Sequence, residues 1–488
     1  MQISVAGYKS AYELEHVARL FFPAADLTPR YPARQPDAVI VRLSKTRMLC
    51  GIRQNQRCAV RVLPRPAEDD KTEYAHAKLL FLLLCEVTGT RPPWGMLTGV
   101  RPVHLVHELC AKGMDDAAVE HWMIDDYFVN PQKQALAAKI ARVQQPILAD
   151  GTPRDYSLYI SIPFCPSRCS YCSFVSRTTA ESGALIAPYI DALCRELAAI
   201  QALAQNLGLR LRTIYIGGGT PTAITAPQLR QLMQTVRDNF DIASVQEYTV
   251  EAGRPDCTTP EKLRIIKEYG ATRISINPQT LSDTVLAAIG RKHTAQDIIT
   301  CFENARAAGH TNINMDLIAG LPLDTKDGFQ KSLSGVMALK PENITVHTLT
   351  LKRASSLVID HAAGRYGDVA TMVDTAHTML ADGYQPYYLY RQKGTLQNLE
   401  NTGYTLPDFA GLYNVYIMEE VHTILSAGAG GSTKLVEHLA QGGARIKRIF
   451  NHKYPIEYLK HFDEVLRRKE GVTDFYGKCT NLDSETAR

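Results

Sequence analysis

The first 150 residues show two patterns of apolar and polar positions. Short runs that are apolar or alternate predict strands at 2–6, 38–43 and 57–63. Apolar residues at helical spacing predict helices at about 11–21, 73–87 and 102–111. These elements predict an N-terminal accessory α/β domain, residues 1–150, without a recognisable catalytic motif. Trp94, in the Pro-rich break before the last of these helices, is expected either to anchor a packed turn or to face an interface or a ligand.

From about residue 156, predicted strands and helices alternate. The strand candidates are 158–162, 213–216, 247–252, 273–277, 313–318 and 344–349. The helical stretches between them include 184–207, 227–240, 259–269 and 294–309, the last with a capping box at Thr294 and Asp297. Such alternation is typical of parallel βα units, so six units predict an incomplete (β/α)6 barrel over residues 151–385. Residues 386–488 are predicted to form a mostly helical C-terminal accessory domain.

The composition is that of a globular protein of two or three domains, with 488 residues, 45% of them apolar and 21% charged. The net charge of +4 is small for this length, which argues against a dedicated nucleic-acid binder. The first twenty residues carry charges throughout, unlike a signal peptide, and the longest apolar run, 79–85, is too short to span a bilayer. The 11 cysteines show no disulfide framework, so we expect a cytoplasmic protein.

Three cysteines, Cys165, Cys169 and Cys172, follow the first barrel strand at CxxxCxxC spacing. Three thiolates can hold three irons of a cubane [4Fe–4S] cluster and leave the fourth iron open to another ligand. A structural zinc site would need a fourth soft ligand, but no histidine lies in this window and the next cysteine, Cys194, falls inside a helical pattern. Buried inert thiols explain single cysteines better than this triplet. The spacing therefore favours an iron–sulfur cluster.

Other candidate residues fall at the ends of the following strands, where the sites of parallel barrels lie. The glycine run 217–219 ends the second strand and lets the backbone approach a ligand closely. Glu251 ends the third strand and is suited to accept hydrogen bonds from ribose hydroxyls. The later strand ends carry Gln279, Arg291 and Asp316. Taken singly, each of these three is also explained as an ordinary barrel-end residue.

Four segments together carry a more specific match, namely 159–165, 217–222, 274–279 and 316–322. They resemble the oxygen-independent coproporphyrinogen III oxidase family of radical S-adenosylmethionine (SAM) enzymes. Three further segments, 94–102, 341–349 and 388–401, resemble the long HemZ-like branch of that family. The resemblance covers nearly the whole chain.

The resemblance implies a [4Fe–4S] cluster on Cys165, Cys169 and Cys172, with one SAM at its open iron and a second SAM nearby. The implied contacts of the cluster-bound SAM are Tyr159, Gly218 and Glu251. Those around a second SAM are Tyr171, Gly219, Thr220, Gln279, Arg291 and Asp316. The candidate partners for substrate carboxylates are Lys352, Arg353, Arg391 and Lys393. No residue is expected to act as a catalytic acid, base or nucleophile, because the cofactor supplies the chemistry.

The implied reaction is the oxidative decarboxylation of two propionate side chains of coproporphyrinogen III to vinyl groups, which gives protoporphyrinogen IX in anaerobic haem biosynthesis. The implied partners are this tetrapyrrole substrate and a low-potential electron donor such as flavodoxin or ferredoxin. We expect a monomer that binds no nucleic acid. Two alternatives stay open: a haem-binding chaperone of the same family, and a radical SAM methyltransferase or ring-opening enzyme that acts on haem.

Overall fold

The computed structural model describes residues 1–10, 12–28, 36–55, 57–68, 71–172, 174, 176–350, 368–439 and 443–479. Two of the predicted cationic residues, Lys352 and Arg353, lie outside the described residues. The chain forms two compact units. The first unit is Met1–Lys139 with Tyr390–Glu400, and the second is Ile140–Leu389 with Asn401–Arg488. The first boundary lies at residue 139, before the predicted one near 150. The segment 390–400, which was predicted to belong to the C-terminal domain, belongs with the N-terminal residues.

The first unit is built on a five-stranded sheet in the order β2-β1-β3-β4-β5. Its strands are β1 Gln2–Ala6, β2 Asp26–Thr28, β3 Ala38–Leu43, β4 Arg47–Gln54 and β5 Arg57–Pro64. Its core packs this sheet against α1 Tyr12–Phe21 and α2 Thr72–Thr88. The prediction missed β2, which is very short, and β4. In β4 the buried side chains Met48, Cys50 and Ile52 alternate, but Leu49 and Gly51 between them are not polar, so the sequence does not show the alternation.

A buried ion pair fastens the segment 390–400 to the rest of the first unit. Trp94 is fully buried, and its Nε1 donates a hydrogen bond of 2.8 Å to Oε2 of Glu400. Nζ of Lys133 lies 2.7 Å from the other carboxylate oxygen of Glu400. Trp94 thus anchors a packed turn, the first of the two roles expected for it. The helices of this part are α3 Pro102–Ala111, α4 Asp116–His121, the π-helix η2 Trp122–Asp126 and α5 Pro131–Ala149.

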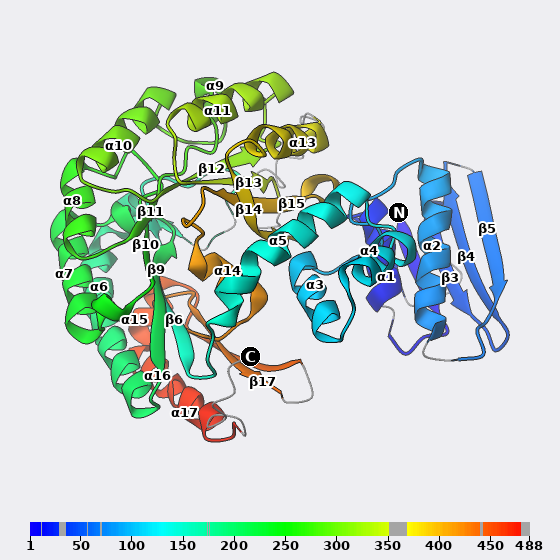
Figure 1. Ribbon diagram of the computed structural model, residues 1–488, viewed down its shortest axis with the longest axis horizontal. Helices are drawn as coiled ribbons and strands as arrows, with labels where there is room; N and C mark the ends of the chain where they lie inside the picture. Colours follow the sequence, from blue (N-terminus) through cyan, green and yellow to red (C-terminus); the bar gives the residue numbers. More distant parts are fainter. Residues whose placement is uncertain are drawn as a thin grey trace. The chain divides into compact units, whose positions relative to one another are not determined.

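The second unit contains the predicted barrel. Six strands lie side by side in chain order and all are parallel, which confirms the six predicted strands. They are β6 Asp155–Ile162, β9 Arg210–Gly218, β10 Glu247–Glu251, β11 Arg273–Ser275, β12 Ile313–Ala319 and β13 Asn343–Thr348. Figure 1 shows helices along the outer side of these strands. They include α6 Thr179–Asn206, α7 Ala226–Asn239, α8 Pro260–Glu268, α9 Asp283–Ala288, α10 Ala295–Ala307, α11 Lys326–Ala338 and α13 Val369–Leu380. The capping box of Thr294 and Asp297 is present at α10.

The C-terminal residues differ from the mostly helical domain that was predicted. They add five strands to the barrel sheet, on both of its sides, to give the order β14-β15-β13-β12-β11-β10-β9-β6-β16-β17-β18. These strands are β14 Gln385–Arg391, β15 Glu400–Thr405, β16 Thr423–Ala427, β17 Ser432–His438 and β18 Ala444–Phe450. The helices are α14 Leu412–Glu419, α15 Pro455–Lys460, α16 Phe462–Arg468 and α17 Glu470–Tyr476. Pairing with an existing sheet edge stabilises these short strands, although the local sequence indicates them only weakly.

Helix α14 packs against β9, at the amino ends of the barrel strands. The carboxylate of Glu247, the first residue of β10, accepts hydrogen bonds from the backbone N–H groups of Leu412 at 2.7 Å and Tyr413 at 3.2 Å. A carboxylate at a helix N-terminus satisfies free N–H groups and suits the helix dipole.

The described helices include none long and apolar enough to cross a bilayer.

Candidate active site

The cysteine loop leaves the end of β6 and is held at several points. Its first cysteine, Cys165, lies in the short strand β7 Phe164–Cys165, which pairs with β8 Arg177–Thr178. The backbone N–H of Ser170 donates to the carbonyl of Ile289 at 3.1 Å, which fixes the middle of the loop against the α9–α10 connection. All three cysteines are free thiols; Cys165 and Cys169 are buried and Cys172 is partly buried. Burial raises the pKa of Cys172 to about 11, so metal binding has to displace its proton.

The glycine run at the end of β9 lies directly against Cys165. The N–H of Gly219 donates to the carbonyl of Ile162 at 2.8 Å, and the N–H of Thr220 donates to that of Phe164 at 2.8 Å. The hydroxyl of Thr220 donates to Sγ of Cys165 at 3.5 Å. A Cβ atom on Gly219 would stand only 2.9 Å from that sulfur, so a residue without a side chain is needed here.

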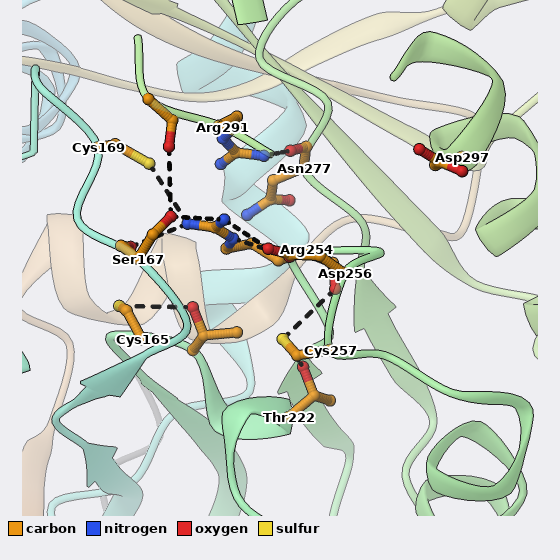
Figure 2. Close-up of polar contacts among 12 residues, drawn as sticks. Cys165, Ser167, Cys169, Thr222, Arg254, Asp256, Cys257, Asn277, Arg291 and Asp297 are labelled. Atoms are coloured by element: carbon orange, nitrogen blue, oxygen red, sulfur yellow. Dashed lines mark hydrogen bonds and ion pairs between the residues drawn. The ribbon is translucent and has the colours of Figure 1, made fainter. Parts of the chain in front are cut away.

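Two arginines converge on Cys169 (Figure 2). Arg254 donates from Nη1 to Sγ of Cys169 at 3.7 Å. The second, Arg291, is buried and donates to the carbonyl of Asn277 at 2.6 Å and to the hydroxyl of Tyr171 at 3.3 Å. The cysteine loop therefore carries fixed positive charge beside it, which favours thiolates and an anionic cluster.

Inside the barrel, Glu251 ends β10 next to stacked tyrosines. The hydroxyl of Tyr215 donates to Oε1 of Glu251 at 2.6 Å. The rings of Tyr159, Tyr215 and Tyr413 are stacked on one another, and we call these three residues the tyrosine stack. Burial raises the pKa of Glu251 to about 7, with the Asp316 carboxylate adding to this shift and the Tyr215 hydrogen bond opposing it. Glu251 therefore titrates near neutral pH.

Asp316 and Gln279 form a second group at the strand ends. The backbone N–H of Gln279 donates to the carbonyl of Asp316 at 2.9 Å, and Gln279 has a left-handed φ of 68°. Nδ2 of Asn314 donates to the Asp316 carboxylate at 2.7 Å, and Nε2 of His347 lies 3.5 Å from it. Burial alone would raise the pKa of Asp316, but His347 and Asn314 outweigh it and keep this pKa below its usual value.

The predicted residues thus form local groups, and some functional neighbours were not predicted. Gly219 and Thr220 adjoin Cys165, Tyr171 pairs with Arg291, and Gly218 turns with a φ of 116°. Sequence reasoning missed Arg254, Asp256, Tyr215 and Tyr413. Arg254 could have been found as a charged residue just after the β10 strand end, whereas Tyr413 has no local signal.

The two predicted carboxylate partners that the structure describes contact other residues of the first unit. The guanidinium of Arg391 donates to the carbonyls of Leu97 at 2.6 Å and Gly99 at 3.2 Å, inside the first unit. Lys393 contacts His16 at 2.8 Å in the same unit. Arg391 is also almost fully buried, so it supports a turn and is not available to a substrate.

The donor set fits an iron–sulfur cluster. The loop offers three free thiols. A hydroxyl donates to one of their sulfurs and a guanidinium to another, and Gly219 places no side chain against the sulfur of Cys165. Among the described residues, no three His, Cys, Asp or Glu side chains are grouped to hold a metal ion. In a cubane each thiolate binds a different iron, so the ligands need not converge on one atom.

Comparisons with known proteins agree with this geometry. Residues 159–334 match the model of the Radical SAM superfamily, whose members use a [4Fe–4S] cluster and SAM. The chain is 39% identical over 394 residues to the Bacillus subtilis oxygen-independent coproporphyrinogen-III oxidase-like protein HemZ, which covers 79% of this chain and 78% of that protein. It is also 39% identical over 197 residues to the Bacillus subtilis heme chaperone HemW, 40% of this chain and 51% of HemW.

A solved structure shows the same fold. Coproporphyrinogen III oxidase HemN from Escherichia coli matches with a TM-score of 0.51 and 23% identity, over 67% of this chain and 73% of that one. The level of identity to HemZ over most of both chains, together with the cysteine loop at the end of the first barrel strand, decides the family. This chain belongs to the HemZ-like branch of the oxygen-independent coproporphyrinogen III oxidase family, within the radical SAM superfamily.

Proposed function

We propose that this protein removes two propionate carboxyl groups from coproporphyrinogen III oxidatively and so gives protoporphyrinogen IX. The observation that carries this proposal is the similarity to a coproporphyrinogen-III oxidase-like protein across 79% of the chain. The arrangement at the strand ends supports it, since the cysteine loop, Gly219 and Glu251 all belong to one barrel. When bound, the cluster and SAM together supply the one-electron chemistry that removes a hydrogen atom from the substrate.

The protein's own residues would bind, orient and exclude water. Cys165, Cys169 and Cys172 would hold the cluster. Glu251, as a carboxylate, would accept hydrogen bonds from the ribose hydroxyls of SAM, and the Tyr215 hydroxyl orients it for this role. The aromatic faces of the tyrosine stack would keep water away from the reacting centre.

Tyr159 and Gly218 would lie around the cluster-bound SAM, as the family resemblance implies. The residues that the resemblance places around a second SAM would surround that molecule: Tyr171, Gly219, Thr220, Gln279, Arg291 and Asp316. Of these, Gly219 and Thr220 contact Cys165 directly, which supports a place beside the cluster itself. Asp316 keeps its charge at neutral pH and so suits an ammonium or hydroxyl group.

The test is anaerobic turnover. The reconstituted full-length protein is given SAM, a low-potential reductant, coproporphyrinogen III and an electron acceptor that takes the one electron left after each hydrogen-atom removal and decarboxylation, and products are followed by mass spectrometry. We expect loss of two carboxyl groups as carbon dioxide, together with SAM cleavage. Cys172→Ala should abolish both, whereas Cys194→Ala, at a half-buried cysteine of helix α6, should preserve them. SAM cleavage without any change in the porphyrinogen would disprove the substrate assignment.

A second candidate is a haem-binding chaperone that turns over no porphyrinogen. The similarity to the heme chaperone HemW over 197 residues favours this alternative. Haem titration of the same preparation discriminates the two candidates. A chaperone should bind haem stoichiometrically and tightly, whereas a decarboxylase should bind coproporphyrinogen III in preference to haem.

A further inference from the structure

Arg254, three residues after the end of β10, contacts the cysteine loop at several points (Figure 2). It is 3% exposed, although it lies only three residues after Glu251 at a strand end. Its Nη1 donates to the carbonyl of Ser167 at 2.9 Å, and its Nη2 donates to the hydroxyl of the same residue at 2.9 Å. Its Nη1 also donates to Sγ of Cys169 at 3.7 Å.

Asp256 holds the other side of this guanidinium. Nε of Arg254 lies 3.0 Å from Oδ1 of Asp256, and Nη2 lies 2.7 Å from Oδ2. A bidentate pair of this kind fixes the plane of the guanidinium and lets the arginine stay charged although it is buried. The geometry therefore aims a fixed positive charge and a hydrogen bond at one cysteine sulfur.

Cys165 and Cys169 have unequal surroundings. Sγ of Cys165 receives a hydrogen bond from the neutral hydroxyl of Thr220, whereas Sγ of Cys169 receives one from a cation. Net charge near a cluster and hydrogen bonds to its sulfurs are two of the factors that set its reduction potential. A cation beside Cys169 stabilises the reduced cluster, which carries one more electron and is more negative.

We propose that Arg254 is a positioning residue that orders the cysteine loop through Ser167 and raises the reduction potential of the cluster through Cys169. Asp256 sets the size of this effect, because it orients the guanidinium and offsets part of its charge. The electron itself comes from a low-potential donor protein or chemical reductant. The proposal rests on the assignment of the three cysteines to the cluster, and it does not depend on the porphyrinogen substrate.

The experiment measures the potential of the cluster in the reconstituted full-length protein. Iron content is determined first, and the ratio of reduced to oxidised cluster is then followed by electron paramagnetic resonance in a redox titration. At the wild-type midpoint we expect this ratio to fall about tenfold in Arg254→Gln, which for one electron corresponds to about 59 mV. Arg254→Lys keeps the charge and should lower the ratio less. Asp256→Asn keeps the arginine and removes the opposing charge, so it should raise the ratio.

Arg306→Gln is the matched control, because Arg306 also pairs with a carboxylate, that of Glu342, but on helix α10. It should leave the potential unchanged. An unchanged ratio in Arg254→Gln with full iron content would overturn the proposal, and so would a fall in Asp256→Asn. If Arg254→Gln takes up too little iron to be titrated, the proposal is tested with Arg254→Lys and Asp256→Asn. Ratios of reduced to oxidised cluster that are unchanged in both variants would refute the inference. A wild-type protein that binds a cluster but leaves coproporphyrinogen III intact would refute only the proposed substrate.

Discussion

Replacing Gly219 with alanine would place a methyl group where the structure has no room for one. The new Cβ would lie 2.7 Å from the carbonyl oxygen of Phe164 and 2.9 Å from Sγ of Cys165. Favourable non-bonded contacts of carbon lie at about 3.5–4.0 Å, so the shortfall at the sulfur is about 0.6 Å or more. Backbone and a cluster ligand cannot move aside as a flexible side chain can. We expect an overpacking cost of roughly 1–3 kcal/mol and a displaced Cys165.

The assay compares iron content, cluster absorbance and thermal unfolding of Gly219→Ala with those of the wild-type protein. The variant should bind less iron and unfold at a lower temperature. The matched control is Gly183→Ala in helix α6, where an added Cβ meets no atom within 4 Å. That change should stabilise the protein by about 0.5–1 kcal/mol, because alanine favours a helix interior over glycine. Wild-type iron content and SAM cleavage in Gly219→Ala would refute this account of the glycine run.

Further predictions concern two glutamates. SAM affinity of the cluster-bound protein should rise with pH through about 7, because burial raises the pKa of Glu251 to about 7 and only its carboxylate accepts from both ribose hydroxyls. Tyr215→Phe should move this rise in SAM affinity to higher pH, because it removes a hydrogen bond to the carboxylate, and Glu251→Gln should abolish the rise. SAM affinity is measured by equilibrium dialysis across neutral pH. The same pH dependence in the wild-type protein and in both variants would contradict this prediction. Glu400→Ala should destabilise the first unit by about 3–5 kcal/mol, because it removes the carboxylate that pairs with the buried ammonium of Lys133. Glu86→Ala, which breaks an exposed ion pair, should cost about 0–1 kcal/mol, and equal denaturation midpoints for the two variants would contradict the burial argument.

The barrel could be predicted from the sequence because its signals are local. Each of its six strands contains a short apolar or alternating segment, and α10 begins with its own capping box at Thr294. The cysteine spacing and Glu251 likewise mark the strand ends without any tertiary information. Local signals also located α1, α2 and α3 in the first unit.

The rest depends on contacts between distant parts of the chain. Tyr413 belongs to the tyrosine stack only because α14 folds back against β9, and nothing near Tyr413 in the sequence indicates this. The role of Arg254 depends on its reach to Ser167, on a different strand end. Arg391 was predicted to be a partner for a substrate carboxylate, but tertiary packing buries it against backbone carbonyls. A periodicity argument cannot detect any of these three relations.

The discontinuous first unit has a consequence for synthesis of the protein. Its buried Glu400 is made long after its partners Trp94 and Lys133, because the intervening chain forms most of the second unit. At roughly 5–20 residues per second, a ribosome reaches residue 400 about 13–52 s after residue 139. During that interval the carboxylate of Glu400 is not yet available to Lys133 or to Trp94. The N-terminal part of the nascent chain can therefore form this buried ion pair only after the barrel has been translated.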